Sequence, residues 1–129
     1  MSQPRRRILC VEDDEDTCFM LGYLLGSPER EVVSAATTEE AREKIAAARF
    51  DLYILDLRVG RRASGGLEFC REIIARDRWA KVIFYTGAGS AAERAAGLAA
   101  GATAYVVKPE IKELARVIER LLAPVTAEG

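Results

Sequence analysis

Residues 50–56 read Phe-Asp-Leu-Tyr-Ile-Leu-Asp, a short apolar run that ends in a carboxylate. Four consecutive apolar residues at 52–55 are typical of a strand covered on both faces, as in a parallel sheet. In open α/β sheets, ligands bind at the carboxyl ends of the strands. The stretch therefore predicts a strand over 50–56 and makes Asp56 a candidate site residue.

The rest of the chain repeats this unit. Further short apolar strands are predicted at residues 8–11, 31–35, 81–85 and 104–107. Helical spacing of apolar residues follows each strand, over about residues 17–25, 38–48, 67–74, 91–100 and 111–122, and capping boxes open two of these helices at 37–40 and 90–93. Five strands alternating with five helices predict an α/β fold, a doubly wound five-stranded parallel sheet with helices on both faces.

Length and charge narrow the classes of function. The 129 residues fit one domain over 1–129, with a core expected at about 7–123 and a tail or clipped linker at 124–129. Nineteen basic and twenty acidic residues give a formal net charge of −1, so we expect no direct binding of nucleic acid or membrane, and residues 5–7 are interpreted as a solvated lead-in. The polar first seven residues do not resemble a signal peptide, and we expect a cytoplasmic protein.

The reactive side chains are equally restricted. Histidine is absent, which excludes Ser/His/Asp and Cys/His catalysis, and Cys10, Cys18 and Cys70 have no paired spacing that would suggest a disulfide framework or a zinc site. Carboxylates, hydroxyls and lysines remain. A metal ion bound by their oxygen atoms would be a hard cation, and we expect Mg²⁺.

Polar residues follow four of the five predicted strands. They are Glu12 and Asp13 after the first, Asp56 after the third, Thr86 after the fourth, and Lys108 before Pro109 after the fifth. Two like charges ~4 Å apart repel by roughly 4 kcal/mol near the protein surface, and a divalent cation would relieve this repulsion. Mg²⁺ and Lys108 would also keep Asp56 ionised and available as a nucleophile. The bond between Lys108 and Pro109 is a candidate cis peptide.

Simpler interpretations exist for some of these residues. Acids at the start of a helix stabilise its macrodipole, which explains Glu15 and Asp16 without a site. Thr86 alone could be a turn hydroxyl, and Tyr105 could be packing at the edge of the sheet. Asp13 and Asp56 are harder to explain in this way, because they end two independent strands.

Taken together, the strand ends resemble the receiver domain of bacterial two-component response regulators over nearly the whole chain. The matching marks are Val11-Glu12-Asp13, Leu55-Asp56, Thr86-Gly87 and Tyr105-Val106-Val107-Lys108-Pro109. The resemblance implies a flavodoxin-like fold with strand order 2-1-3-4-5. It also implies phosphorylation of Asp56 by a histidine kinase or phosphotransfer protein, in a signalling module whose only catalysis is limited self-phosphorylation and self-dephosphorylation.

The resemblance also implies a role for each site residue. Asp13, Asp56 and the backbone carbonyl of Arg58 would bind Mg²⁺, with Glu12 acting through a coordinated water and Asp14 replacing Asp13 if the register slips. Lys108 and Thr86 would contact phosphoryl oxygens. Thr86 would move toward the phosphoryl group and Tyr105 would turn into the space left behind. That switch would reshape the face of helix four, strand five and helix five, where a downstream protein or a second copy of the chain could bind.

Some positions depart from the receiver pattern. The loop after Asp56 is about two residues longer than usual, Gly60 stands where a proline is common, and Glu110 replaces an apolar residue. Arg58 and Ala88 occupy the positions two after Asp56 and two after Thr86, which tune phosphoryl lifetime in this family. We expect Arg58 to lie over or near the phosphoryl group.

Two other functions compete with this interpretation. A haloacid-dehalogenase-type phosphatase also uses an Asp nucleophile with Mg²⁺, but it carries a second Asp two residues later, where this chain has Arg58. A binding scaffold that never needs the phosphoryl group is the other alternative.

Overall fold

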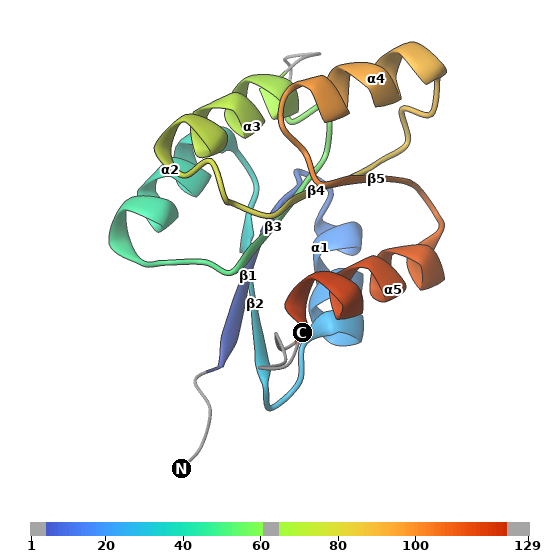
Figure 1. Cartoon of the computed structure of the whole chain (residues 1–129). Helices are drawn as coiled ribbons and strands as arrows, with labels where there is room; N and C mark the ends of the chain where they lie inside the picture. Colours follow the sequence, from blue (N-terminus) through green and yellow to red (C-terminus); the bar gives the residue numbers. More distant parts are fainter. Residues whose placement is uncertain (1–4, 61–64, 124–129) are drawn as a thin grey trace, which may run out of the picture.

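The computed structural model describes residues 5–60 and 65–123, and five strands alternate with five helices along them (Figure 1). In chain order these are β1 Arg6–Val11, α1 Glu15–Leu25, β2 Arg30–Ala35, α2 Thr38–Ala47, β3 Leu52–Leu55, α3 Gly65–Arg76, β4 Val82–Thr86, α4 Ala91–Ala99, β5 Ala104–Val107 and α5 Ile111–Leu122. All neighbouring strands pair in parallel, in the order β2-β1-β3-β4-β5. The predicted fold class and strand order are confirmed.

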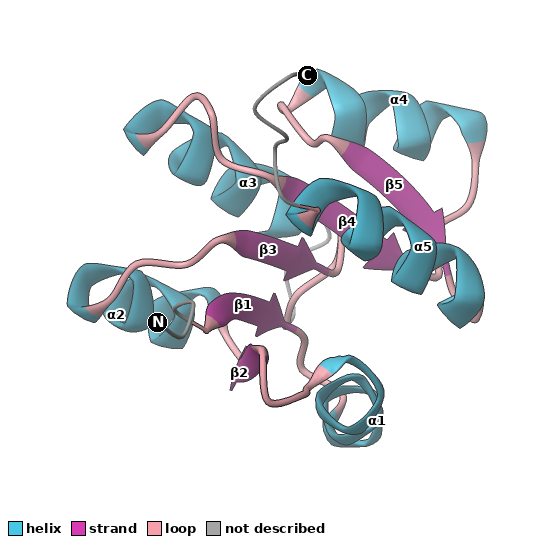
Figure 2. Cartoon of the chain, turned by 60° about the horizontal axis from the view of Figure 1, so that its bottom comes forward, coloured by secondary structure: helices cyan, strands magenta, loops and turns pink. Residues whose placement is uncertain are grey.

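Helices cover both faces of this sheet. Helices α1 and α5 lie on one face, and α2, α3 and α4 lie on the other (Figures 1 and 2). Because successive side chains of a strand point to opposite faces, β1 supplies both halves of the core. Ile8 and Cys10 pack with α1 and α5, whereas Leu9 and Val11 pack with α2 and α3.

The pairing register brings four strand ends to one edge of the sheet. Val11 pairs with Leu55, and Thr86 pairs with Val107. The ladder continues just past the strands, since the Asp56 backbone N–H donates to the Val11 carbonyl at 3.1 Å. The residues at or just after the ends of β1, β3, β4 and β5 therefore share one rim, as the sequence predicts.

Several predicted strand boundaries were wrong. Strand β1 begins at Arg6, so Arg6 and Arg7 are part of the sheet, and only Arg5 of the basic run precedes it as an exposed residue. Strand β3 is shorter than predicted, and Phe50 and Asp56 lie outside it. Phe50 is only 7% exposed, and the Arg7 guanidinium lies 4.7 Å from its ring centroid. The Phe50 ring therefore packs beneath a basic side chain, which a strand pattern alone does not predict.

The helix starts mostly follow the predicted caps. Helix α4 has a complete capping box, in which the Ser90 and Glu93 side chains each accept the other's backbone N–H. In α2, Thr37 accepts from the Glu40 N–H, but the Glu40 carboxylate turns to the Ala36 N–H instead, so this capping box is incomplete. Both arrangements satisfy backbone donors that a helix leaves free at its first turn.

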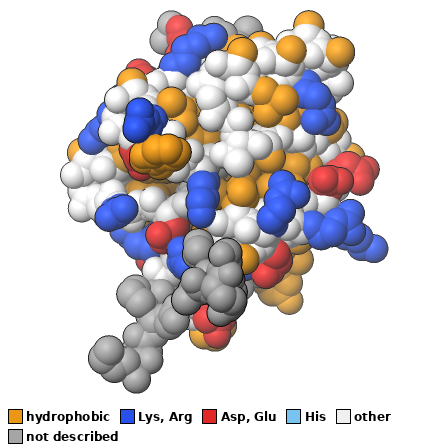
Figure 3. All heavy atoms as spheres, in the orientation of Figure 1, with side chains coloured by type: hydrophobic (Ala, Val, Ile, Leu, Met, Phe, Trp, Pro, Cys, Tyr) orange, Lys and Arg blue, Asp and Glu red, His pale blue; other side chains and the backbone are white. Residues whose placement is uncertain are grey.

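Several further expectations concern the whole chain. All three cysteines are free thiols, two buried and Cys18 partly exposed. On the face in Figure 3, basic and acidic side chains of the described residues are interspersed, in keeping with the near-zero net charge. None of the helices in the described part of the chain has the length and apolar character that a membrane crossing requires. The predicted tail at 124–129 and most of the lengthened loop, at 61–64, lie outside the described residues.

Candidate functional site

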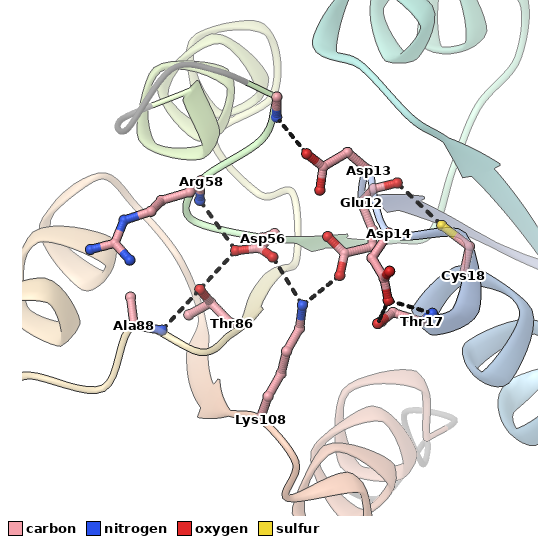
Figure 4. A network of polar contacts seen from close by, with 11 residues as sticks. Glu12, Asp13, Asp14, Thr17, Cys18, Asp56, Arg58, Thr86, Ala88 and Lys108 are labelled. Atoms are coloured by element: carbon pink, nitrogen blue, oxygen red, sulfur yellow. Dashed lines mark hydrogen bonds and ion pairs between the residues drawn. The ribbon is translucent and has the colours of Figure 1, made fainter.

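Asp56 lies at the centre of a network of polar contacts at this rim (Figure 4). Its Oδ1 accepts from the Thr86 hydroxyl at 2.8 Å and from the Arg58 backbone N–H at 3.2 Å, and its Oδ2 accepts from Lys108 Nζ at 3.0 Å. Burial alone would raise the pKa of Asp56, but the bonds from Thr86 and Lys108 outweigh it and hold the pKa below its ordinary value. Asp56 is therefore kept as a carboxylate.

Lys108 connects the two strand ends that carry acids. Its Nζ lies 2.5 Å from Glu12 Oε1 and 3.0 Å from Asp56 Oδ2, from a backbone position just after β5. The Lys108–Pro109 peptide bond is cis, as predicted. Burial would lower the pKa of Lys108, but its contacts with the two carboxylates raise it. The ammonium group thus offsets the repulsion between the acids.

Glu12 is the most buried acid of the site, with 4% of its surface exposed. Burial, and to a smaller extent the neighbouring Asp56, raises its pKa to about 7, although the contact with Lys108 opposes this shift. Its Oε2 is buried and has no hydrogen-bond partner among the described residues. A buried carboxylate oxygen without a donor is costly, so this atom is a natural ligand for a cation or a bound water.

Asp13 and Asp14 differ in the groups that their carboxylates contact. The Asp14 carboxylate caps α1, accepting from the Thr17 N–H at 2.9 Å and from the Thr17 hydroxyl. Asp13 instead faces the loop after β3, where its Oδ2 accepts from the Gly60 N–H at 3.1 Å. Asp14 is thus occupied as a helix cap, and α1 begins two residues earlier than predicted.

The structure does not bring the predicted metal ligands onto a single point. Over residues 5–60 and 65–123, no three Asp, Glu or Cys side chains cluster as the ligands of one ion would. The Lys108 ammonium lies between Glu12 and Asp56, and Asp13 is turned to Gly60. The chemistry of the set still fits a hard cation, since it consists of carboxylates and includes the unpartnered Glu12 Oε2.

A second chain of contacts leads from Asp56 to Tyr105. The Thr86 hydroxyl, bonded to Asp56, accepts from the Ala88 N–H at 3.3 Å, and the Ala88 carbonyl accepts from the Tyr105 hydroxyl at 2.5 Å. Tyr105 is 5% exposed, and its ring lies 5.8 Å from that of Phe84. The two predicted switch residues are therefore linked through the backbone of Ala88, a connection the sequence did not reveal.

Tyr105 depends on a glycine of α4 for its position. A Cβ added at Gly97 would lie 2.8 Å from the Tyr105 ring and 3.1 Å from Phe84. The Arg94 guanidinium, also on α4, lies 5.4 Å from the Tyr105 ring centroid. Tyr105 and Arg94 also line a hollow of about 180 Å³, together with Val106, Val107, Glu110 and Glu113. This hollow belongs to the face of α4, β5 and α5 that the resemblance singles out.

The backbone of Arg58 contacts Asp56, but its side chain points out of the site (Figure 4). Its Nη2 donates to Glu93 Oε2 at 2.6 Å, and in Figure 4 the guanidinium points away from the Asp56 carboxylate. The backbone of Arg58 thus contacts Asp56, while its guanidinium group contacts α4. The sequence identifies the partner, Glu93, only as a member of the capping box at 90–93.

The loop after β3 returns to α3 through a close contact. A Cβ at Gly66 would lie 2.0 Å from the Asp56 carbonyl oxygen, and the Gly66 N–H donates to the Leu57 carbonyl at 2.9 Å. Only glycine fits this approach. The start of α3 is thereby held directly against the backbone of Asp56.

Comparison with known proteins agrees with this geometry. The response regulator receiver domain family matches residues 8–119. The phosphate regulon transcriptional regulatory protein PhoB of Rhizobium meliloti is 35% identical over 105 residues, which are 80% of this chain and 45% of that protein. The DNA-binding transcriptional activator DevR/DosR of Mycobacterium tuberculosis is 35% identical over 117 residues, 88% of this chain and 52% of that protein. The chain thus spans about half the length of these relatives.

Solved structures give the same result. The non-phosphorylated receiver domain of HemR from Leptospira biflexa superposes with a TM-score of 0.83 at 31% identity, covering 95% of this chain and 98% of that one. The response regulator TrrA from Thermotoga maritima, in complex with Mg²⁺ and BeF, gives 0.79 at 31% identity, covering 91% and 99%. The strand order, the residues at the strand ends and these relatives agree: the chain belongs to the response regulator receiver domain family of two-component systems.

Proposed function

We propose that this chain accepts a phosphoryl group on Asp56 and relays its presence to a protein-binding face. The observation that carries the proposal is the Asp56 carboxylate, held ionised between Lys108 Nζ and the Thr86 hydroxyl at the carboxyl edge of the sheet. Glu12 and Asp13 lie on the neighbouring strand end.

The chemistry follows from these contacts. An Asp56 oxygen attacks the phosphorus of a phosphohistidine, the bond from phosphorus to the donor imidazole breaks, and an acyl phosphate forms. Lys108 neutralises charge on the transferred oxygens, and the Thr86 hydroxyl donates to one of them. Asp13, Asp56, the Arg58 backbone carbonyl and, through a water, Glu12 would hold Mg²⁺, which supplies further charge neutralisation when bound.

The contacts beyond Asp56 support a role in signalling. Phosphorylation of Asp56 adds close to two negative charges beside the Thr86 hydroxyl. The backbone of Ala88 connects this hydroxyl to Tyr105. Tyr105 lines the hollow between α4 and α5, so a change at Thr86 reaches this face through two hydrogen bonds. The partners we propose are a histidine kinase or phosphotransfer protein upstream and a downstream protein, or a second copy of the chain, at the α4-β5-α5 face.

The test is phosphorylation with acetyl phosphate and Mg²⁺, followed by intact mass spectrometry. Wild type should gain one phosphoryl group and Asp56→Asn none. Asp14→Asn is the matched control, because the amide keeps the helix cap and should leave phosphorylation intact. Phosphorylation of Asp56→Asn at the wild-type level would refute the assignment of Asp56.

One observation favours a second candidate, a scaffold that works without phosphorylation. The Asp56 carboxylate itself already accepts the Thr86 hydroxyl bond, and Tyr105 is already buried. These are the positions that the resemblance predicts for the phosphorylated form. Equal affinity of wild type and Asp56→Asn for a downstream partner, with and without acetyl phosphate, would favour the scaffold.

A further inference from the structure

The Glu93 carboxylate makes two separate contacts at the start of α4. Its Oε1 accepts from the Ser90 N–H at 3.1 Å and completes the capping box, while its Oε2 accepts from Arg58 Nη2 at 2.6 Å. The Ser90 hydroxyl in turn accepts from the Glu93 N–H at 3.1 Å. Hydrogen bonds with Ser90 lower the pKa of Glu93, and the charge of Arg58 lowers it to a smaller extent, so the carboxylate is charged.

The two partners of this ion pair are held with different firmness. Glu93 is fixed by the capping box, and its side chain is 28% exposed. Among the described residues, Arg58 is fixed at its backbone, where its N–H contacts Asp56, and its side chain is 59% exposed. Rotation about the Arg58 side-chain bonds can therefore move the guanidinium, whereas the carboxylate stays in place.

The position of the Arg58 backbone sets up a competition for its guanidinium. A phosphoryl group on Asp56 would place nearly two negative charges beside the residue from which this side chain extends. Guanidinium groups bind phosphoryl oxygens through paired, charge-assisted hydrogen bonds. Glu93 offers one charge at a fixed point on α4, and so draws the same group away from Asp56.

We propose that Glu93 is a positioning residue that withholds the Arg58 guanidinium from the phosphoryl group and thereby shortens the life of the aspartyl phosphate. This inference rests on the proposed phosphorylation of Asp56. In hydrolysis, a water oxygen bonds to phosphorus as the bond to the Asp56 oxygen breaks, which releases phosphate and restores the carboxylate. A guanidinium lying on the phosphoryl oxygens blocks the approach of that water, and Glu93 keeps this cover partly open.

The decisive variant is Glu93→Gln. A capping box accepts Glu or Gln at this position, so the start of α4 is preserved while the charge that holds Arg58 is lost. After acetyl phosphate is removed in the presence of Mg²⁺, we expect the phosphoryl half-life to rise about threefold, the size typical of an exposed charge contact. Glu39→Gln is the matched control, because it removes another first-turn glutamate paired with an arginine, on α2.

The double variant separates positioning from a merely structural role. Arg58→Ala keeps the backbone carbonyl and N–H but has no guanidinium, so Glu93→Gln should change nothing when added to it. If Glu93→Gln lengthens the half-life equally in the Arg58→Ala background, or leaves wild type unchanged, the inference is wrong while the proposed function stands. If wild type takes up no phosphoryl group from acetyl phosphate or a histidine kinase, both fall together.

Discussion

Lys108 and Arg58 are both cations beside Asp56, yet the structure holds them in opposite ways. Lys108 Nζ lies between two carboxylates inside the site, with 25% of its side chain exposed. Arg58 contacts Asp56 through its backbone only, and its guanidinium, on a side chain 59% exposed, pairs with Glu93 on another element. Among the residues that the structure describes, Lys108, the inner cation, pairs only with acids inside the site, whereas Arg58, the outer one, pairs with an acid of α4.

This difference in position suggests different roles for the Lys108 ammonium and the Arg58 guanidinium. An ammonium is a compact point charge and fits between Glu12 and Asp56, where it sets their ionisation. A guanidinium on an exposed, flexible arm can change partners at little cost. We therefore expect substitutions of Lys108 to affect phosphorylation itself, and substitutions around Arg58 to affect only how long the phosphoryl group stays.

The largest effect should come from Lys108→Met. The substitution removes the charge that contacts Asp56 and leaves its carboxylate facing Glu12. Losing one such stabilising contact costs about 100-fold in rate at sites where charge develops in the transition state. The rate of phosphorylation by acetyl phosphate, followed by intact mass, should fall by about that factor.

Lys112→Met provides the control for this prediction. Lys112 is an exposed lysine near the start of α5, four residues beyond Lys108, and it should behave as wild type. If Lys108→Met and Lys112→Met phosphorylated at the same rate, the inner cation would be no more important than a surface charge. The contrast between the inner and outer cations would then collapse.

The packing behind the site should give the next largest effect. Gly97→Ala places a methyl group 2.8 Å from the Tyr105 ring, so we expect overpacking to lower the free energy of unfolding by about 1–3 kcal/mol. Gly22→Ala is the matched control, because it lies in α1 with nothing within 4 Å of its added Cβ. That variant should be more stable than wild type by about 0.5–1 kcal/mol. Urea unfolding measures the free energy of unfolding of both variants. Equal changes in the two variants would show that the Tyr105 ring moves aside without cost.

The acids at the end of β1 allow a third comparison. Asp13→Ala removes a proposed Mg²⁺ ligand and should weaken Mg²⁺ binding at least about tenfold in isothermal titration calorimetry. Asp14→Ala removes the cap of α1 and should lower Tm by about 4 °C while leaving Mg²⁺ affinity unchanged. The opposite pattern would mean that the Asp13 contact with Gly60 is structural and that the metal lies nearer α1.

The sequence predicted the features that depend on strand ends. Asp56 and Lys108 each follow an apolar strand and Thr86 ends one, and parallel pairing brings such residues to one rim whatever the loops do. Their contacts were therefore predictable as a group. The distinction between Asp13 and Asp14 was not, because it depends on where the first turn of α1 begins and on which donor each carboxylate meets.

Contacts across loops were the least predictable. Arg58 precedes Glu93 by 35 residues, and their pairing depends on how α4 packs beside the loop after β3. The sequence around Arg58 and Glu93 therefore does not predict that their side chains meet. Phe50 shows the same limit, since its ring packs against Arg7 of a neighbouring strand although its backbone lies before the start of β3.

The smallest predicted effect concerns the stability that the outer ion pair provides. The Arg58 side chain donates one hydrogen bond to Glu93 and is 59% exposed, so solvent screens the pair and Arg58→Ala should leave the urea midpoint almost unchanged. Arg42 is the control, because its guanidinium donates twice to Glu72, at 2.9 Å each, in the forked geometry that strengthens such pairs. Arg42→Ala should lower the midpoint measurably. A larger loss from Arg58→Ala than from Arg42→Ala would make the outer pair a structural brace, and an arm that braces the fold could not be released to cover a phosphoryl group.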